Sequence, residues 1–252
     1  MTLSLQTINK HKPPRILIYG TAGIGKSTFG AMAPDPVFIQ TEDGLDAINV
    51  AHYPLANTYQ EVMGYLSELC TEPHDYKTLV IDSVDWFERI LQAQLCGERN
   101  VKSISDIPYG KGYEIALDLW REYISALNYL RDNRGMMIIQ IAHADIKRFE
   151  NPETEGYDRY QIKLHQKASA LLDEHSDIVL FANHVVSVRK KQDGFKETVK
   201  AIGSGQRVLH TEERPAFKAK NRYSLPAEIP FDKDGAYWTE LVQHIPYYNK
   251  GE

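Results

Sequence analysis

The sequence predicts an α/β domain with a mostly parallel central sheet, helices on both faces and an antiparallel hairpin toward the C-terminus. Three observations lead to this fold class. Short apolar runs typical of strands alternate with segments of helical periodicity through residues 15–141, as in parallel sheets with crossover helices. The residues Gln192-Asp193-Gly194 suit a tight turn, and they separate two further strand-like stretches, 185–191 and 197–202. A length of 252 residues suits one large domain.

We expect this domain to span residues 15–245, between a flexible leader over 1–14 and a tail over 246–252. Its elements alternate in chain order. Strands are expected over 15–19, 37–40, 78–81, 136–141 and 177–182, and helices from Ser27 onward and over 57–70, 84–95 and 113–132. The segment 144–166 is long and polar, and we expect a loop there.

The composition is that of an ordinary globular protein, with 42% hydrophobic and 25% charged residues. No apolar stretch approaches the roughly 20 residues needed to cross a bilayer. The first residues lack the basic region and apolar core of a signal peptide. Cys70 and Cys96 have no metal-ligand spacing, so we expect reduced thiols. These observations predict a cytoplasmic protein that has no membrane partner.

Charge is unevenly distributed along the chain. The net charge of −5 argues against a globally basic surface for nucleic acid. Residues 187–222 nevertheless hold ten basic and four acidic residues, a net of +6, which leaves −11 for the rest. Such asymmetry is typical of a surface for an anionic partner, although a solvated hairpin can have the same composition.

The residues Gly20-Thr21-Ala22-Gly23-Ile24-Gly25-Lys26-Ser27 match the pattern G-x4-G-K-[S/T] of a phosphate-binding P-loop, also called Walker A. They follow a strand-like run and precede a helix, which is the context that such a loop requires. The loop N–H groups and the helix N-terminus, which includes Thr28, would face the phosphates. Lys26 would bridge the β- and γ-phosphates, and the Ser27 hydroxyl would hold Mg²⁺. The sequence therefore predicts a site for a nucleoside triphosphate.

Three polar residues at predicted strand ends could complete a hydrolytic site. Asp82 ends an apolar run in the manner of a Walker B aspartate, at the sheet edge where α/β folds bind ligands, and would hold Mg²⁺. Glu42 follows the second strand, where a carboxylate could orient and deprotonate the attacking water. Gln140 closes the fourth strand, where an amide could sense the γ-phosphate. The alternatives are an ordinary polar turn at Asp82 and an exposed strand-end amide at Gln140.

The order of these segments resembles the ATPase core of RecA-type recombinases over about residues 13–230. Residues 37–46 resemble the strand that ends in the catalytic glutamate, here Glu42. Residues 79–84 resemble the Walker B segment, and residues 138–141 resemble the strand that ends in the allosteric glutamine, here Gln140.

The likeness extends to the DNA-binding and intersubunit segments of that family. Residues 145–166 occupy the place of its second DNA-binding loop, and Gly110-Lys111-Gly112 that of the first. The segment 217–226 resembles the one whose two basic residues, here Lys220 and Arg222, reach the ATP of a neighbouring subunit.

This resemblance implies a RecA-like P-loop NTPase core that hydrolyses ATP with Mg²⁺, binds single-stranded DNA and forms a homo-oligomer with ATP between protomers. The short form looks most like phage-encoded single-strand annealing recombinases, which implies a bacterial host's cytoplasm and a single-strand-binding protein as a further partner. Asn49 stands where RecA places an aromatic residue on the adenine, whereas Asp46 could contact the adenine edge.

Five basic residues are expected to contact DNA beside aromatic residues that could stack on bases: Lys111, Lys147, Arg148, Arg159 and Lys163. Acidic residues in the same segment cancel much of this charge, so a solvated lid is an alternative. Two solvated strand residues are likewise the alternative for Lys220 and Arg222. We expect His143 and His165 to be ordinary polar positions, because no Cys or second His stands at zinc spacing.

The leading hypothesis is an ATP-dependent, single-stranded-DNA-binding ATPase that promotes annealing or strand exchange in phage recombination. The second is a P-loop switch or assembly protein that acts on a protein partner, which the net acidic charge and the mixed charges of residues 145–166 favour. A small-molecule kinase is the third, although no arginine-rich lid follows at the expected place.

Overall fold

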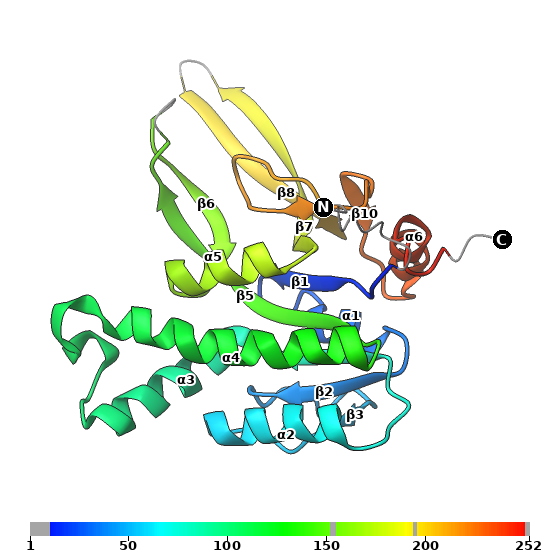
Figure 1. Ribbon diagram of the computed structural model, residues 1–252. Coiled ribbons are helices and arrows are strands. Elements are labelled where there is room, and N and C mark those ends of the chain that lie inside the picture. Colours follow the sequence, from blue (N-terminus) through cyan, green and yellow to red (C-terminus); the bar gives the residue numbers. More distant parts are fainter. Residues whose placement is uncertain (1–10, 152–154, 194–195, 250–252) are drawn as a thin grey trace, which may run out of the picture.

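The computed structural model describes residues 11–151, 155–193 and 196–249. Among them a ten-stranded sheet has the order β10-β8-β7-β1-β5-β4-β2-β3, with β6 paired to β5 and β9 paired to β7 (Figure 1). The strands are β1 (Arg15–Gly20), β2 (Pro36–Gln40), β3 (Ala51–His52), β4 (Thr78–Asp82), β5 (Met137–Phe149), β6 (Tyr157–Ile162), β7 (Ile178–Asp193), β8 (Lys196–His210), β9 (Lys220–Asn221) and β10 (Glu228–Pro230). The helices are α1 (Lys26–Ala31), α2 (Tyr59–Thr71), α3 (Val84–Arg99), α4 (Gly112–Asn133), α5 (Gln166–His175) and α6 (Ala236–His244), with short 3₁₀ turns at Ile104–Asp106 and Pro108–Gly110.

The central part of the sheet is parallel. Strand β1 pairs in parallel with both β5 and β7, and the parallel pairing continues from β5 through β4 and β2 to β3. Strands β8 and β10 extend the sheet in the antiparallel sense. The predicted α/β fold class, with its antiparallel hairpin, is confirmed. Gly194 of the predicted tight turn lies outside the described residues.

Successive side chains along each strand point to opposite faces of the sheet, so the core has two layers. In β1, Leu17 and Tyr19 join the cluster that includes buried residues of α2, α3, α4 and α5. Ile16 and Ile18 join the opposite cluster, which includes Phe29 of α1 and Trp238 of α6. Because the strands are covered on both faces, they read as continuous apolar runs rather than as alternating ones. This packing fixes the strand ends that carry the site.

The C-terminal helix α6 packs directly on the helix that follows the P-loop. The indole Nε1 of Trp238 donates to the Phe29 carbonyl at 3.0 Å, and the two ring centroids lie 4.6 Å apart. Burial of two such aromatic side chains is worth several kcal/mol. Helix α6 therefore holds α1, and with it the P-loop, against the sheet.

The expectation of a loop over residues 144–166 is wrong. Strand β5 runs on to Phe149 and pairs antiparallel with β6, from Ala144 opposite Ile162 to Phe149 opposite Tyr157, which makes a two-stranded ribbon. Figure 1 shows this ribbon extending away from the helices. Because so much of it faces solvent, its strands lack the long apolar runs of the central strands, and their polar composition resembles that of a loop.

Two other boundaries also differ from expectation. The strands expected over 177–182 and 185–191 are one continuous strand, β7, with an irregularity in its pairing between His184 and Val186. Contacts of the domain extend past residues 15 and 245: the Pro13 carbonyl accepts from Arg131 Nε at 2.6 Å, and Tyr248 packs against the second core cluster. Leader residues 1–10 lie outside the described part of the chain.

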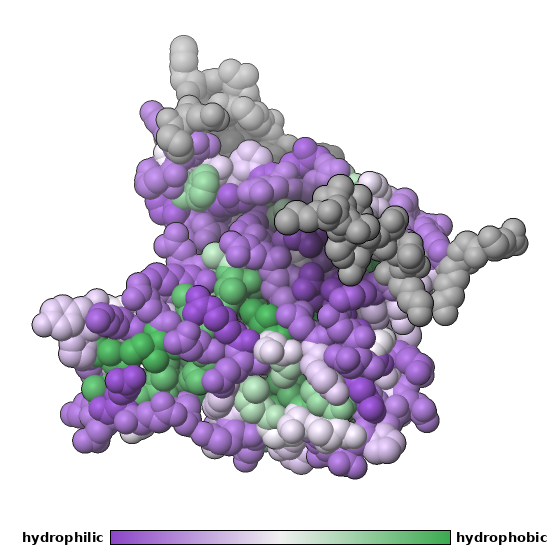
Figure 2. Space-filling model, in the orientation of Figure 1, coloured by the Kyte–Doolittle hydropathy of each residue, from purple (hydrophilic) through white to green (hydrophobic). Residues whose placement is uncertain are grey.

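The surface in Figure 2 is mostly hydrophilic along the β5–β6 ribbon, whereas hydrophobic residues gather over the region of α2, α3 and α4. Within the described residues, none of the helices has the length and apolar character that would let it span a bilayer.

A buried carboxylate anchors the edge of the sheet where β1 and β7 begin. Asp177 accepts hydrogen bonds from Arg15 Nη2 at 2.9 Å, Arg222 Nη1 at 3.1 Å and Arg131 Nη2 at 3.3 Å. Burial alone would raise the pKa of Asp177, but the hydrogen bonds and charges of Arg15 and Arg131 outweigh it and hold that pKa below its usual value. The ion pairs therefore join β1, β7, α4 and the segment after β9.

Replacing Asp177 with alanine should lower the free energy of unfolding by about 3–5 kcal/mol, because it leaves two largely buried arginines unpaired. Urea unfolding at neutral pH measures this, with Asp118→Ala as the control, since the exposed Asp118–Arg121 pair is worth less than about 1 kcal/mol. The difference in free energy of unfolding between wild type and Asp177→Ala should have its full size above pH ~4, the pKa of Asp in an unfolded chain. It should disappear as the pH falls through the lower pKa of Asp177 in the folded state. A gap independent of pH would contradict this.

Candidate active site

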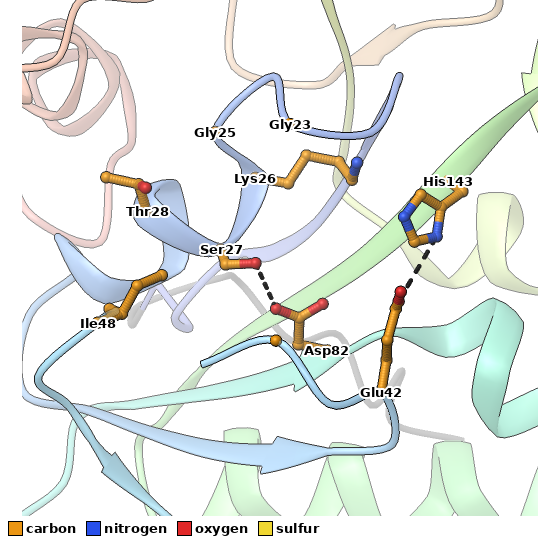
Figure 3. A pocket seen from close by; sticks show the side chains of 10 residues that line it. Gly23, Gly25, Lys26, Ser27, Thr28, Glu42, Ile48, Asp82 and His143 are labelled. Atoms are coloured by element: carbon orange, nitrogen blue, oxygen red, sulfur yellow. Dashed lines mark hydrogen bonds and ion pairs between the residues drawn. The ribbon is translucent and has the colours of Figure 1, made fainter. Parts of the chain in front are cut away.

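The loop between β1 and α1 has the backbone shape of a phosphate cradle. Gly23 and Gly25 have φ values of 72° and 110°, which L side chains rarely adopt. Gly20 ends β1, where a Cβ would overlap the carbonyl of Ala182 in the neighbouring strand. Gly23, Gly25 and Thr28 line the pocket with Lys26 and Ser27 (Figure 3). The remaining loop residues, Gly20, Thr21, Ala22 and Ile24, are not among the lining residues.

Lys26 is held inside the cradle. Its Nζ donates to the carbonyls of Gly20 at 3.1 Å and Thr21 at 2.9 Å, and the residue is only 6% exposed. Burial lowers the pKa of Lys26, although nearby carboxylates, Asp82 first, oppose the shift. An anion beside this ammonium group would offset the cost of its burial, which is what a phosphate does in a P-loop.

Ser27 and Asp82 form a pair suited to a divalent cation. Ser27 Oγ donates to Asp82 Oδ2 at 2.6 Å (Figure 3). Burial raises the pKa of Asp82, against the opposing effects of the Ser27 hydrogen bond and the Lys26 charge. A buried carboxylate and a hydroxyl are hard oxygen donors of the kind that Mg²⁺ prefers. The two side chains therefore fit the metal that the sequence predicts.

Glu42 points into the same pocket from the end of β2. Its Oε2 accepts from Ser83 Oγ at 3.3 Å and lies 3.8 Å from Nδ1 of His143 (Figure 3). The strand register explains this meeting, since Gln40 pairs with Asp82 in neighbouring parallel strands. Glu42 therefore has two polar partners and an open face toward the pocket.

His143 lines the pocket but was expected to be an ordinary polar residue. It lies opposite Gly20 in the β1–β5 register, level with the start of the P-loop. Asp85 binds it twice: the His143 backbone N–H donates to Oδ1 at 3.0 Å, and Nδ1 lies 3.1 Å from Oδ2. Burial alone would raise the pKa of Asp85, but the bonds from His143 outweigh it and lower that pKa. An ionised Asp85 therefore favours the tautomer with its proton on Nδ1 and fixes the orientation of the His143 ring.

The structure does not bring Gln140 to the pocket. Its side chain is fully buried in the interior of β5, where Oε1 accepts from Tyr123 Oη of α4 at 3.0 Å. The expectation that the strand ends at Gln140 is wrong, because β5 continues for nine more residues. His143 is the residue of β5 that lies level with the P-loop. The sequence signal for a longer strand was that, apart from Gln140, its apolar residues continue through Ala142.

The segment after β2 contributes Gly44 and Ile48 to the pocket. Asp46, which the sequence predicts at the adenine edge, is exposed and is not among the lining residues, and the same holds for Asn49, which stands at the RecA aromatic position. The Ile48 side chain is apolar, so it suits van der Waals contact with a flat base or a ribose and cannot form a hydrogen bond with either.

Lys220 and Arg222 lie at the other edge of the sheet from the P-loop. Lys220 of β9 pairs with Val179 at the start of β7, and its Nζ donates to the Asp173 carbonyl at the end of α5 at 2.6 Å. Burial lowers the pKa of Lys220. Arg222 pairs with Asp177 at 3.1 Å and is about half exposed. Neither residue lines the pocket of its own chain.

The residues expected at DNA differ in their accessibility. Lys111 is exposed just before α4, and Lys163 is exposed at the end of the β5–β6 ribbon nearest the sheet. Lys147 is half-buried and donates to the Leu164 carbonyl at 3.0 Å, whereas Arg148 is exposed beside Glu150.

Arg159 does not fit its expected role. It is 6% exposed, pairs with Glu213 at 2.8 Å and lies over the ring of Phe149. The guanidinium is packed between Phe149 and Glu213 along the ribbon, so a phosphate reaches it only by breaking that packing.

Comparison with known proteins places this geometry in a family. A family model described as an AAA domain matches residues 12–223. The chain is also 26% identical over 204 residues to the SPbeta prophage-derived uncharacterized protein YorG of Bacillus subtilis (strain 168). That match covers 79% of this chain and 57% of the length of YorG, so the chain spans somewhat more than half of that relative. With its P-loop, its Ser27–Asp82 pair and a family match over most of its length, the chain belongs to the AAA domain family of P-loop ATPases.

Proposed function

We propose that the chain is an Mg²⁺-dependent ATPase that binds single-stranded DNA and promotes annealing or strand exchange in phage recombination. The observation that carries the ATPase part is the convergence of Lys26, Ser27, Asp82 and Glu42 on one pocket. The DNA part rests on the segment order of a RecA-like core and on the basic residues of the β5–β6 ribbon. The prophage origin of YorG supports a phage setting.

Each pocket residue has a role in this chemistry. Glu42 would take a proton from water as the water oxygen bonds to the γ-phosphorus and the bond from that phosphorus to the ADP oxygen breaks. Lys26 would hold the β- and γ-phosphate oxygens, and Ser27 and Asp82 would hold Mg²⁺. The bound ion supplies positive charge at the phosphate oxygens. His143, oriented by Asp85, would keep Glu42 in place and offer Nε2 to the γ-phosphate side of the pocket.

Strand β5 joins the pocket to the proposed DNA surface. His143 lies on this strand at the pocket, and four residues later Lys147 lies in the ribbon. The Lys163 N–H also donates to the His143 carbonyl at 2.9 Å. Movement of His143 on nucleotide binding would therefore be passed to two basic residues of the ribbon through backbone.

The proposed oligomer places ATP between protomers. The pocket opens where the parallel strands end, whereas Lys220 and Arg222 lie where β7 begins. A head-to-tail arrangement would bring these two cations of one protomer toward the pocket of the next. Such a cation can accelerate phosphoryl transfer by ~10³–10⁵-fold. A single-strand-binding protein is a further proposed partner, on the resemblance alone.

A P-loop switch that acts on a protein partner is the second candidate. The mixed charge of the ribbon favours it, because Asp145, Glu150 and Asp158 alternate with its basic residues and Arg159 is buried. The two candidates share the nucleotide site and differ in what the ribbon binds.

Glu42→Gln should slow ATP hydrolysis by about 10²–10⁴-fold while ATP still binds, because it removes the proton acceptor and leaves the cradle intact. Lys26→Ala should instead abolish ATP binding. Steady-state phosphate release and titration with a fluorescent ATP analogue separate the two effects. Lys12→Ala is the matched control, since Lys12 is an exposed lysine that pairs with Asp132 outside the pocket. ATP affinity retained in Lys26→Ala would refute the nucleotide site.

The double variant Lys111→Glu with Lys163→Glu should bind single-stranded DNA more weakly and lose DNA-stimulated ATP hydrolysis. Each lost phosphate contact should reduce the slope of log affinity against log salt by about 1. Fluorescence anisotropy with a labelled oligonucleotide across a salt series measures this, with Lys12→Glu as the control. If wild type shows no salt-dependent DNA binding and no stimulation, the protein-partner function replaces the DNA one while the nucleotide site stands.

A mixture of Lys26→Ala and Arg222→Ala should recover ATPase activity that neither variant has alone. The first supplies an intact Arg222, and the second supplies an intact P-loop, so one composite site in a mixed oligomer holds both. Lys26→Ala mixed with Glu42→Gln is the control, because both changes damage the same pocket and no recovery is expected. Wild-type activity in Arg222→Ala alone would sink the shared site.

A further inference from the structure

Arg207 of β8 reaches the outer side of the P-loop. Its Nη1 donates to the Ile24 carbonyl at 2.8 Å. Ile24 stands between Gly23 and Gly25, which line the pocket, but is not itself a lining residue. The guanidinium therefore touches the loop from behind, on the side away from the phosphates.

Two contacts fix Arg207 in this place. Its guanidinium carbon lies 4.9 Å from the centre of the Phe231 ring, and the Phe231 N–H donates to the Arg207 carbonyl at 2.9 Å. Phe231 is 2% exposed and packs edge-on to Phe29 of α1, with ring centroids 6.3 Å apart. Neither a carbonyl nor an aromatic ring neutralises a guanidinium, so these contacts leave its positive charge beside the loop.

The contact also explains part of the glycine pattern. A Cβ on Gly25 would lie 2.7 Å from Arg207 Nη1, and Gly25 already requires glycine because its φ is 110°. The close approach of Arg207 and the positive φ therefore both require glycine at position 25.

The bonded carbonyl belongs to the peptide group whose N–H is that of Gly25. In a trans peptide the carbonyl and the N–H point in opposite directions. A cationic donor on the Ile24 oxygen draws electron density from the peptide, which makes the Gly25 N–H a stronger donor to an anion. Arg207 thus acts on the phosphate side of the loop without reaching the pocket.

We propose that Arg207 is a positioning residue for phosphate binding, which ties the P-loop to β8 and polarises the peptide between Ile24 and Gly25. This rests on the proposed nucleotide site. It adds a specific consequence, namely that binding of ligands with a β-phosphate depends on Arg207 while binding of AMP does not, since the loop cradles the β- and γ-phosphates.

Calorimetric titration of wild type, Arg207→Lys and Arg207→Met with ADP and with AMP, in the presence of Mg²⁺, tests the inference. Arg207→Met should weaken ADP binding by about tenfold, the value of one hydrogen bond to a charged group, and leave AMP binding unchanged. Arg207→Lys keeps the charge but loses the planar stacking on Phe231, so an intermediate loss is expected. Arg121→Met, in an exposed arginine of α4, is the matched control.

Thermal unfolding of the same variants separates positioning from simple support of the fold. A lowered Tm with an unchanged ratio of ADP to AMP affinity would overturn the inference, as would ADP affinity equal to wild type in Arg207→Met. Failure of wild-type protein to bind ADP would sink the nucleotide site itself, which is a different result. Recovery of the ADP preference in Arg207→Lys relative to Arg207→Met would support the role of the charge.

Discussion

The parallel pairing of β1, β5, β4 and β2 is the constraint on which the site depends. Its register sets Gly20 beside His143 and Asp82 beside Gln40, so that the P-loop, the Walker B carboxylate and the segment carrying Glu42 meet at one edge. A slip of one residue in any of these strands would turn its side chains to the opposite face. Because the strands are buried on both faces, such a slip would be costly. The apolar core therefore fixes the register, and the register fixes which polar residues meet at the site.

The pocket concentrates charges that solvent does not fully screen. Burial raises the pKa of Asp82 and lowers that of Lys26, so each charge is costly where it lies. The Asp85–His143 pair shows the opposite balance, because paired hydrogen bonds there outweigh burial and keep the carboxylate ionised. A phosphate would supply the negative counter-charge for Lys26, and a divalent cation would supply the positive counter-charge for Asp82. The site is therefore arranged for a ligand pair of opposite sign rather than for either alone.

Local sequence patterns were sufficient to locate the site residues whose position depends only on a short segment of the chain. The P-loop from Gly20 to Ser27, Asp82 after its apolar run and Glu42 after β2 all lie at the pocket, because strand ends and loops follow directly from apolar runs and glycines. Gln140 and His143 were assigned the wrong way round, since the true end of a strand depends on what pairs with it beyond the core. Arg159 was misjudged for a related reason: its burial comes from Phe149 and Glu213, and Glu213 lies 54 residues away in sequence.

The β5–β6 ribbon and the antiparallel β7–β8 pair each include a strand that contacts the P-loop or lies level with it. Strand β5 passes from His143 at the pocket into the β5–β6 ribbon, and Arg207 of β8 holds the Ile24 carbonyl next to the β7–β8 pairing. Extended strands transmit displacement along their length more faithfully than loops do, because ladder hydrogen bonds must move together. In the proposed function, nucleotide in the cradle and a partner on the β5–β6 ribbon would act on the same few peptide groups. If that partner bound one nucleotide state more tightly than the other, linkage would require it to change nucleotide affinity by the same factor.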